Sequence, residues 1–319
     1  MIGRCLQSIA KQSLLPDEVL IIDDGSTEEV PEAIIRQYNE QLKIKIYRHN
    51  QREGVSAARN SGLWKAQYEI IAYLDSDDTW AAGHLLQSVK IFREHANIGF
   101  VFGADQIIDE KNILTTEAVR AKQQRRNSWP KYGNEMEPGC FFMDQEKALD
   151  LCLRNNKATL FTSTMVIKRG RLHPFPYFDE TLHLLEDKDY YIRLLSITES
   201  VFLRACQAQY YIHENNTISI YKVPLKRRLP QLYDELKAIR KKLNYAMNIS
   251  QRREIREELG EQYYVVGAAL IENNQINEAN DYLKQSYGLK PCWAVLKHII
   301  IQKIFSKRLL MRIYRINNE

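Results

Sequence analysis

Residues 69–80 read EIIAYLDSDDTW, a short apolar run that ends in three carboxylates. The first six residues predict a buried strand, because they are almost continuously apolar. Asp75, Asp77 and Asp78 then lie where the strand leaves the sheet, which is the end at which open α/β sheets bind ligands. Crowded carboxylates repel one another unless a cation compensates them, and Mg²⁺ and Mn²⁺ prefer such oxygen ligands, often shared with phosphates. The stretch therefore indicates a metal–diphosphate site, although an acidic turn that caps the next helix fits the same residues.

The segments on both sides of this stretch alternate between strand and helix patterns. Helices are predicted at residues 3–13, 28–41, 55–67, 81–95 and 144–156, and strands at 18–22, 44–47, 99–102 and 160–167. Residues 112–139 have no clean period and are predicted to form a flexible loop or lid. Alternation at this spacing is typical of an α/β fold with a largely parallel sheet, whereas every pattern from Leu225 onward is helical.

Length and composition set further bounds. The 319 residues suffice for one large domain and a smaller one, and 45% hydrophobic and 27% charged residues are ordinary for a soluble protein. No apolar run approaches the roughly 20 residues that cross a bilayer, and no secretory signal is visible. The five cysteines are scattered and lack metal-type spacing, which is typical of free thiols in a reducing compartment. We therefore expect a cytoplasmic protein.

The net charge of +5 is unevenly distributed. From Lys222 onward the chain carries 19 Lys and Arg against 10 Asp and Glu, whereas the preceding part carries 26 against 30. This shift indicates two units with different partners, and we place the boundary between residues 222 and 223. The basic excess lacks the aromatic interleaving of single-strand binders, so nucleic acid is not a predicted partner.

The predicted helical region, residues 223–319, contains a helix pair at about 260–293 that resembles one tetratricopeptide repeat. The matching residues are Tyr263, Val266, Gly267, Leu270, Ala279, Leu283, Ser286 and Pro291. A plain helical hairpin is the alternative interpretation. One repeat cannot bury its own face, so it is expected to pack on a neighbouring helix or on the first domain. The basic amphipathic end, Trp293 to Arg315, predicts either a helix peripheral to the inner membrane face or a cap on the repeat.

Four polar segments recur in the first domain: DDGS at 23–26, GVSAARNSG at 54–62, DSDD at 75–78 and EDKD at 186–189. In this order, across about residues 3–215, they resemble the inverting family 2 glycosyltransferases of the GT-A fold. The resemblance implies a Rossmann-like α/β domain with a mixed, mostly parallel sheet sandwiched by helices, followed here by the all-helical region. It also implies a nucleotide-diphospho-sugar donor, a bound Mn²⁺ or Mg²⁺ ion and a hydroxyl acceptor.

On the donor side, the resemblance implies roles for three residues. Asp24 would hydrogen-bond the nucleotide base, and Asp23 would support it or the ribose; an Asx-turn around Gly25 is the alternative. Arg59 would reach the nucleotide or the diphosphate with a fork of hydrogen bonds. A salt bridge from Arg59 to a nearby acid is the alternative there.

At the metal, the resemblance implies that Asp77 is a ligand of the ion that bridges both phosphates. Asp75 would contact the ribose or a metal-bound water. The ion would neutralise charge that develops on the leaving diphosphate. His213 stands where some relatives contact the diphosphate or the metal, although a lone histidine at a strand end also fits a structural role. For Asp78 the structural role, holding the loop or capping a helix, is favoured.

The pair Glu186 and Asp187 opens a predicted helix on the acceptor side. In the family that it resembles, the aspartate is the general base, and in-line displacement with inversion requires a carboxylate within hydrogen-bond reach of the attacking hydroxyl. We therefore assign Asp187 as the base and Glu186 as a group that positions base or acceptor. Two helix N-terminal acids favoured by the helix dipole are the alternative.

One feature departs from the family pattern. Relatives usually begin with an apolar strand and a Pro-x-Tyr-Asn-like loop, whereas this sequence starts at the following helix. The neighbouring strands are then expected to show exposed edges. We favour a start that is set too late. The predicted function is metal-dependent inverting glycosyl transfer to a glycan, lipid-linked or protein acceptor in polysaccharide, glycolipid or glycan synthesis. The alternative is a catalytically impaired scaffold whose helical tail binds a protein partner.

Overall fold

The computed structural model describes residues 1–28, 31–109, 111, 116–154, 159–213, 223–291 and 295. The chain divides into two compact units. The first consists of Met1–Cys152 and Asn156–Glu214, and the second of Leu153–Asn155 and Asn215–Glu319. The predicted boundary after residue 222 adjoins residues 214–222, which lie outside the described part, so it stays a prediction.

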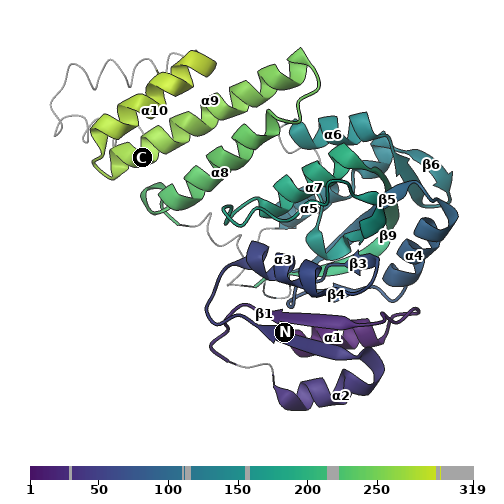
Figure 1. The fold of residues 1–319 in the computed structure, drawn as a ribbon. Helices are drawn as coiled ribbons and strands as arrows, with labels where there is room; N and C mark the ends of the chain where they lie inside the picture. The colour runs from purple at the N-terminus through teal and green to yellow at the C-terminus, as the bar shows by residue number, and fades with distance from the viewer. Residues whose placement is uncertain are drawn as a thin grey trace. The chain divides into compact units, whose positions relative to one another are not determined.

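The first unit begins with a small parallel sheet. Strands β1 (Val19–Asp23) and β2 (Ile44–Arg48) pair in register from Val19–Ile44 to Asp23–Arg48. Helices α1 (Ile2–Ala10), α2 (Glu32–Leu42) and α3 (Val55–Lys65) accompany this sheet (Figure 1). The buried side chains of α1 follow helical spacing and join an apolar cluster with residues of β1 and of the chain after β3.

A larger, mixed sheet follows, with the strand order β3-β8-β5-β9-β7-β6 and β4 paired to β9. Its strands are β3 (Ile70–Ala72), β4 (Thr79–Trp80), β5 (Ile98–Ile108), β6 (Asn134–Glu137), β7 (Cys140–Met143), β8 (Val166–Lys168) and β9 (Glu199–Tyr211). The β5–β9 pair is parallel, and the other described pairs of this sheet are antiparallel. The mixed sheet is confirmed, but with more antiparallel pairs than the sequence suggests, because the short added strands run against their neighbours.

Helix α4 (His84–Glu94) packs on this sheet through Ile91 and Phe92, in a cluster with residues of β5, β8 and β9. Helices α6 (Gln145–Leu153) and α7 (Glu186–Ile197) complete the regular structure described after β7. Figure 1 shows β5 and β9 side by side in the sheet of this unit, as their register requires.

Two sequence-based expectations about local structure are wrong. Residues 112–139 contain helix α5 (Thr116–Arg126), a 3₁₀ turn at Trp129–Tyr132 and strand β6, where a loop was expected. The reason is tertiary, because the fully buried Trp129 ring packs edge-on against Phe102 at 4.9 Å. The strand expected at 160–167 begins only at Val166, after a 3₁₀ turn at Thr162–Thr164.

Strands β1 and β3 have a partner on one side each among the described residues. β1 pairs with β2, and β3 pairs with β8. Both strands are strongly apolar, yet all three residues of β3 are only half-buried. Each strand is therefore an edge of its sheet among the described residues.

The second unit is helical where it is described, with α8 (Leu229–Lys242), α9 (Ile249–Glu272) and α10 (Ile276–Leu289). Helices α9 and α10 form a hairpin that crosses closely at Gly267, where an added Cβ would lie 3.0 Å from the Leu283 side chain. Leu232 of α8 joins the same buried cluster, so a neighbouring helix covers the hairpin as expected. The helical region is thus confirmed, whereas its likeness to a tetratricopeptide repeat stays a prediction. Apart from Val295, the basic end at 293–315 lies outside the described residues.

None of the helices in the described ranges is both long enough and apolar enough to cross a bilayer.

Candidate active site

The acidic turn after β3 is fixed by one buried serine. Ser163 Oγ accepts a hydrogen bond from the Asp75 backbone N–H at 3.2 Å and donates one to Asp78 Oδ2 at 2.7 Å. The Asp78 N–H donates to the Asp75 carbonyl at 3.0 Å, which closes the turn. Because Ser163 and Asp78 are both buried, the turn is held from inside the fold.

Asp78 also ties the turn to the end of β9. Its Oδ1 accepts a hydrogen bond from the Tyr211 N–H at 3.4 Å. Burial, and after it the charges of Asp75 and Asp77, raise the pKa of Asp78 to about 8. A carboxyl with this pKa is mostly protonated at neutral pH. Asp78 therefore has the structural role that the sequence favours, and burial is the main reason for its raised pKa.

Asp77 faces the histidine that follows β9. His213 Nε2 lies 2.9 Å from Asp77 Oδ2, and the two side chains are 24% and 26% exposed. Arg4 of α1 donates to the Asp77 carbonyl at 3.2 Å, and its guanidinium lies 3.3 Å above the centre of the Tyr211 ring. The Asp77 carboxylate is thus placed by two elements far apart in sequence, and it remains open to solvent.

Arg59 of α3 joins the acidic turn to the start of α7. Its Nη2 donates to both oxygens of Asp75 at 3.0 and 3.1 Å, and its Nη1 donates to Glu186 Oε1 at 3.0 Å. Burial alone would lower the pKa of Arg59, but the charges of Asp75, Glu186 and Asp187 raise it above its ordinary value. One guanidinium therefore holds carboxylates that stand 111 positions apart in the chain, at residues 75 and 186.

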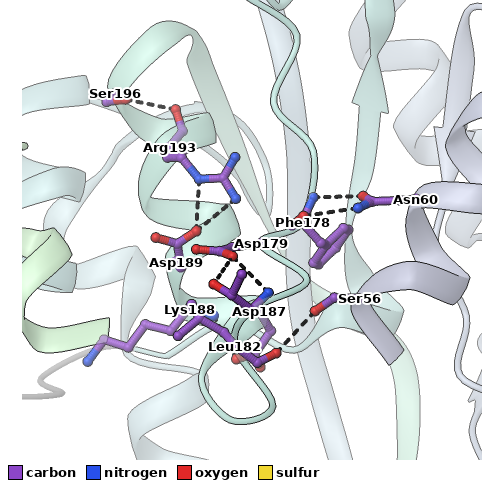
Figure 2. A network of polar contacts seen from close by, with 11 residues as sticks. Ser56, Asn60, Phe178, Asp179, Leu182, Asp187, Lys188, Asp189, Arg193 and Ser196 are labelled. Atoms are coloured by element: carbon purple, nitrogen blue, oxygen red, sulfur yellow. Dashed lines mark hydrogen bonds and ion pairs between the residues drawn. The ribbon is translucent and has the colours of Figure 1, made fainter. Parts of the chain in front are cut away.

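The segment that leads into α7 is pinned to α3. Asn60 exchanges two hydrogen bonds with the Phe178 backbone, at 2.9 and 2.8 Å, and Ser56 Oγ donates to the Leu182 carbonyl at 3.4 Å. Figure 2 shows both contacts beside Asp187 and the ion pair of Arg193 with Asp189. α3 therefore positions its own Arg59 and also the carboxylates at the start of α7.

Glu186 and Asp187 lie next to each other at the first turn of α7. Burial, and then the charge of Asp187, raise the pKa of Glu186 to about 7. Arg59 works in the opposite direction but does not cancel this effect. A perturbed carboxyl beside a second carboxyl is a pattern that clusters at functional sites.

The two acids of the DDGS turn after β1 have lowered pKa values, unlike Asp78 and Glu186. Asp23 accepts a hydrogen bond from the Ser26 N–H at 2.9 Å. The Ser26 side chain, and then its N–H and the charge of Arg48, hold the pKa of Asp23 below its ordinary value against the effect of burial. Asp24 binds the loop before α3, accepting from the Glu53 and Gly54 N–H groups at 2.9 and 2.8 Å. Partial burial opposes its charge, but these bonds and His49 keep the pKa of Asp24 low.

Gly25 is required in this turn because its φ is +67° and an added Cβ would lie 2.7 Å from the Arg52 backbone N. The Asp23 carboxylate thus accepts from the N–H three residues on, one position beyond an Asx-turn, and closes the turn around Gly25. Nucleotide binding by Asp23 and Asp24 stays a prediction.

The structure therefore gathers most of the predicted residues in one unit. Asp75, Arg59 and Glu186 are in direct contact, Asp187 is close enough to affect the charge state of both Arg59 and Glu186, and Asp77 contacts His213. The salt-bridge alternative for Arg59 is present, and its contact with a donor stays a prediction. Sequence reasoning missed Ser163 and Arg4. Their side chains stand in stretches without a motif, so no local signal identifies them.

The acidic turn does not bring three ligand atoms together by itself. Within the described part of the chain, one group of three, Glu94, His95 and Glu137, has its ligand atoms within 4.8 Å of one another. Lys90 already pairs with both of those glutamates, at 3.5 and 2.8 Å. The ligand atoms of Asp75, Asp77 and His213 do not all lie within 4.8 Å of one another.

With this geometry established, comparison with known proteins identifies the family. A family model described as "Glycosyl transferase family 2" matches residues 1–151. Residues 1–151 therefore carry a family 2 glycosyltransferase domain. The match covers the acidic turn, Arg59 and the DDGS turn, and the family 2 resemblance is confirmed for these residues. The EDKD segment at 186–189 lies beyond the match, and inversion stays a prediction.

Named relatives agree with this family. The chain is 31% identical over 141 residues to an uncharacterized glycosyltransferase, alr2836, of Nostoc sp., covering 40% of this chain and 43% of that protein. It is 25% identical over 193 residues to WfgD of Escherichia coli, a UDP-Glc:α-D-GlcNAc-diphosphoundecaprenol β-1,3-glucosyltransferase, covering 60% of this chain and 63% of WfgD. The chain thus spans less than two thirds of the length of these curated relatives.

Solved structures show the same fold. Residues 1–349 of TarS from S. aureus, in complex with UDP, align with a TM-score of 0.53 at 15% identity, covering 91% of this chain and 85% of that one. The mannosyltransferase PcManGT of Pyrobaculum calidifontis, in complex with GDP-Man and Mn²⁺, aligns with a TM-score of 0.50 at 13% identity, covering 100% and 84%. The GT-A fold class predicted for this family 2 member is therefore confirmed.

Proposed function

We propose that this protein transfers a sugar from a nucleotide-diphospho-sugar to a hydroxyl acceptor. The observation that carries the proposal is the Arg59 bridge, which places the acidic turn and the Glu186–Asp187 pair in one site. The family match and the nucleotide-sugar ligands of TarS and PcManGT support the class of donor. Which sugar and which acceptor are used is decided by parts of the site that these contacts do not define.

A divalent ion fits the residues of the acidic turn. Asp75 and Asp77 offer carboxylate oxygens, and His213 offers an imidazole nitrogen beside Asp77. The charges of Asp75 and Asp77 add to the effect of burial in raising the pKa of Asp78, so the three carboxyls of the turn lie close enough to interact. Mn²⁺ or Mg²⁺ would be held by Asp77, with Asp75 and His213 beside it, and would neutralise charge on the leaving diphosphate.

Asp187 is proposed to take the proton of the acceptor hydroxyl, with inversion at the sugar carbon. A general base must lie opposite the leaving group and remain ionised. Glu186 lies beside Asp187, whose charge contributes to the raised pKa of Glu186. Its carboxylate accepts a hydrogen bond from Arg59 and so holds Arg59 in place. Arg59 in turn holds Asp75, so the donor side and the acceptor side are aligned by one side chain.

The test is the Asp187→Asn variant in an assay that measures release of UDP, GDP or TDP from a panel of nucleotide sugars with Mn²⁺. We expect turnover to fall about 100-fold or more, the scale of a general base. Donor affinity, measured by calorimetry, stays near that of the unmodified protein because Asp187 does not touch the acidic turn. The exposed Asp17→Asn is the matched control. Full turnover in Asp187→Asn contradicts the base assignment.

The same calorimetry separates the enzyme from the scaffold alternative. A transferase binds nucleotide sugar with a heat that depends on Mn²⁺. A scaffold with a helical interaction tail shows no such heat, with any of the donors.

A further inference from the structure

Three aromatic rings gather at the C-terminal end of α3, and none of them is among the residues proposed for the active site. Trp64 lies 5.7 Å from Tyr177, and Tyr177 lies 5.3 Å from Phe175, measured between ring centres. Trp64 is 63% exposed and Tyr177 is 41% exposed. Single exposed rings are common on soluble proteins, but a contiguous group of them marks a binding surface.

The support under these rings is rigid. Arg169 donates hydrogen bonds to the Leu63 and Ala66 carbonyls, which caps the last turn of α3, and its guanidinium lies 5.6 Å from the centre of the Phe175 ring. The two bonds between Asn60 and the Phe178 backbone fix the other end of the segment. The rings are thus presented by a fixed framework and not by a free loop.

Positive charge surrounds the rings. Residues 168–177 read KRGRLHPFPY, with three basic residues and no acid, and Lys65 follows Trp64 directly. Lys65 and Arg171 are exposed. Glu69 approaches this segment with its carboxylate beside Gly170, and the acids Asp179 and Glu180 follow Tyr177 closely in sequence. Lys65 and the three basic residues of 168–177 outnumber these three acids by one. We call Trp64, Lys65, Arg169, Arg171, Phe175 and Tyr177 the aromatic–basic surface.

We propose that the aromatic–basic surface binds an anionic lipid bilayer. Trp and Tyr place an apolar ring and a polar edge at the level of the lipid headgroups, and Lys and Arg attract anionic headgroups. The rings are tilted to one another by 58° and 68°, so they do not form the common flat face that would lie along an extended sugar chain. This inference does not depend on the proposed glycosyl transfer.

The test is co-sedimentation of the full chain with vesicles of phosphatidylglycerol and phosphatidylcholine in equal parts, against vesicles of phosphatidylcholine alone. We expect binding to the anionic vesicles only. Lys65→Glu and Arg171→Glu each weaken it about fivefold or more, as about one kcal/mol per basic residue implies. Trp64→Ala with Tyr177→Ala weakens it further.

The matched controls are Lys131→Glu and Tyr132→Ala, because these neighbours form an exposed basic–aromatic pair elsewhere in the same unit, with Tyr132 37% exposed. Both controls retain binding. A second readout is the tryptophan emission, which shifts to the blue with anionic vesicles and does not shift in Trp64→Phe.

Three outcomes overturn the proposal. In the first, the unmodified chain does not bind the anionic vesicles. In the second, the Trp64 variant binds as well as the unmodified chain, which assigns membrane contact to another segment such as residues 293–315. In the third outcome, neutral oligosaccharides bind and the Trp64 variant loses them, which makes the surface a glycan site.

Discussion

Buried charges are organised differently in the two units of this chain. In the helical unit, the side chain of Lys242 is 3% exposed and its ammonium meets both oxygens of Glu258 at 2.6 and 2.7 Å. In the first unit, Arg59 is shared between Asp75 and Glu186, and the pKa values of Asp78 and Glu186 are raised. One arrangement is balanced and stabilises a helix pair, whereas the other leaves excess negative charge where a cationic or proton-donating ligand would bind.

The largest expected effect concerns the unbalanced site. Asp77→Asn removes a proposed metal ligand, so we expect transfer to fall about 100- to 1,000-fold, the scale of lost electrostatic stabilisation of a leaving group. The measurement is nucleotide release with Mn²⁺ titrated over a wide range, with Asp17→Asn as the control. An unchanged Mn²⁺ dependence in Asp77→Asn would show that the excess charge serves another purpose.

The balanced pair is tested by breaking it. Lys242→Met leaves the Glu258 carboxylate, 12% exposed, without its partner. Urea unfolding should show a loss of about 3 kcal/mol in the free energy of unfolding, because an unpaired buried charge is costly. Adding Glu258→Leu to this variant should recover most of the lost free energy of unfolding.

The control for this pair is Arg253→Met. Arg253 and Glu257 form an ion pair on the same helix whose side chains are 80% and 42% exposed. Exposed pairs contribute little, so the change should stay below about 0.5 kcal/mol. Equal losses in both variants would mean that burial does not distinguish the two pairs.

The smallest expected effect is a pH dependence at Glu186. Its pKa in the folded protein is raised from 4.5 to about 7, so the stability linked to its protonated form is present below pH 4.5 and is lost as the pH rises through 7. Glu186→Gln lacks this titration. As the pH rises from 4.5 to about 7, the free energy of unfolding of the variant should therefore increase relative to that of the unmodified protein, by an amount of order 1 kcal/mol.

Thermal unfolding from acid to neutral pH measures this difference. Exposed Glu28→Gln is the matched control and should follow the unmodified protein at every pH. A constant offset between Glu186→Gln and the unmodified protein would show that Arg59 fully compensates the Glu186 charge.

Much of the site is readable in the sequence because its residues occur in short motifs at strand ends. Asp75, Asp77 and the Glu186–Asp187 pair are recognisable in this way, and the fold class follows from the alternation of strand and helix. The sequence leaves two alternatives for Arg59, a salt bridge to a nearby acid or a contact with the nucleotide-sugar donor, because it does not show which charges meet. Ser163, which holds the acidic turn, carries no signal because a serine between two threonines is chemically ordinary.

The segments whose structure the sequence predicts wrongly also depend on contacts between residues that are distant in the chain. The order in residues 116–137 depends on Trp129 packing against Phe102, a contact between positions 27 residues apart. Nothing within the segment itself reveals that partner. The antiparallel strands of the larger sheet are likewise short, and short strands are set by their neighbours more than by their own pattern.

By itself, then, the sequence determined the family resemblance and the fold class and named the candidate acids, because periodicity and strand-end motifs are local properties. Only the tertiary structure decided which charges share a partner, which carboxyls have raised pKa values and which rings stand exposed together. Those properties depend on distance and burial, and the chain creates them only when it folds.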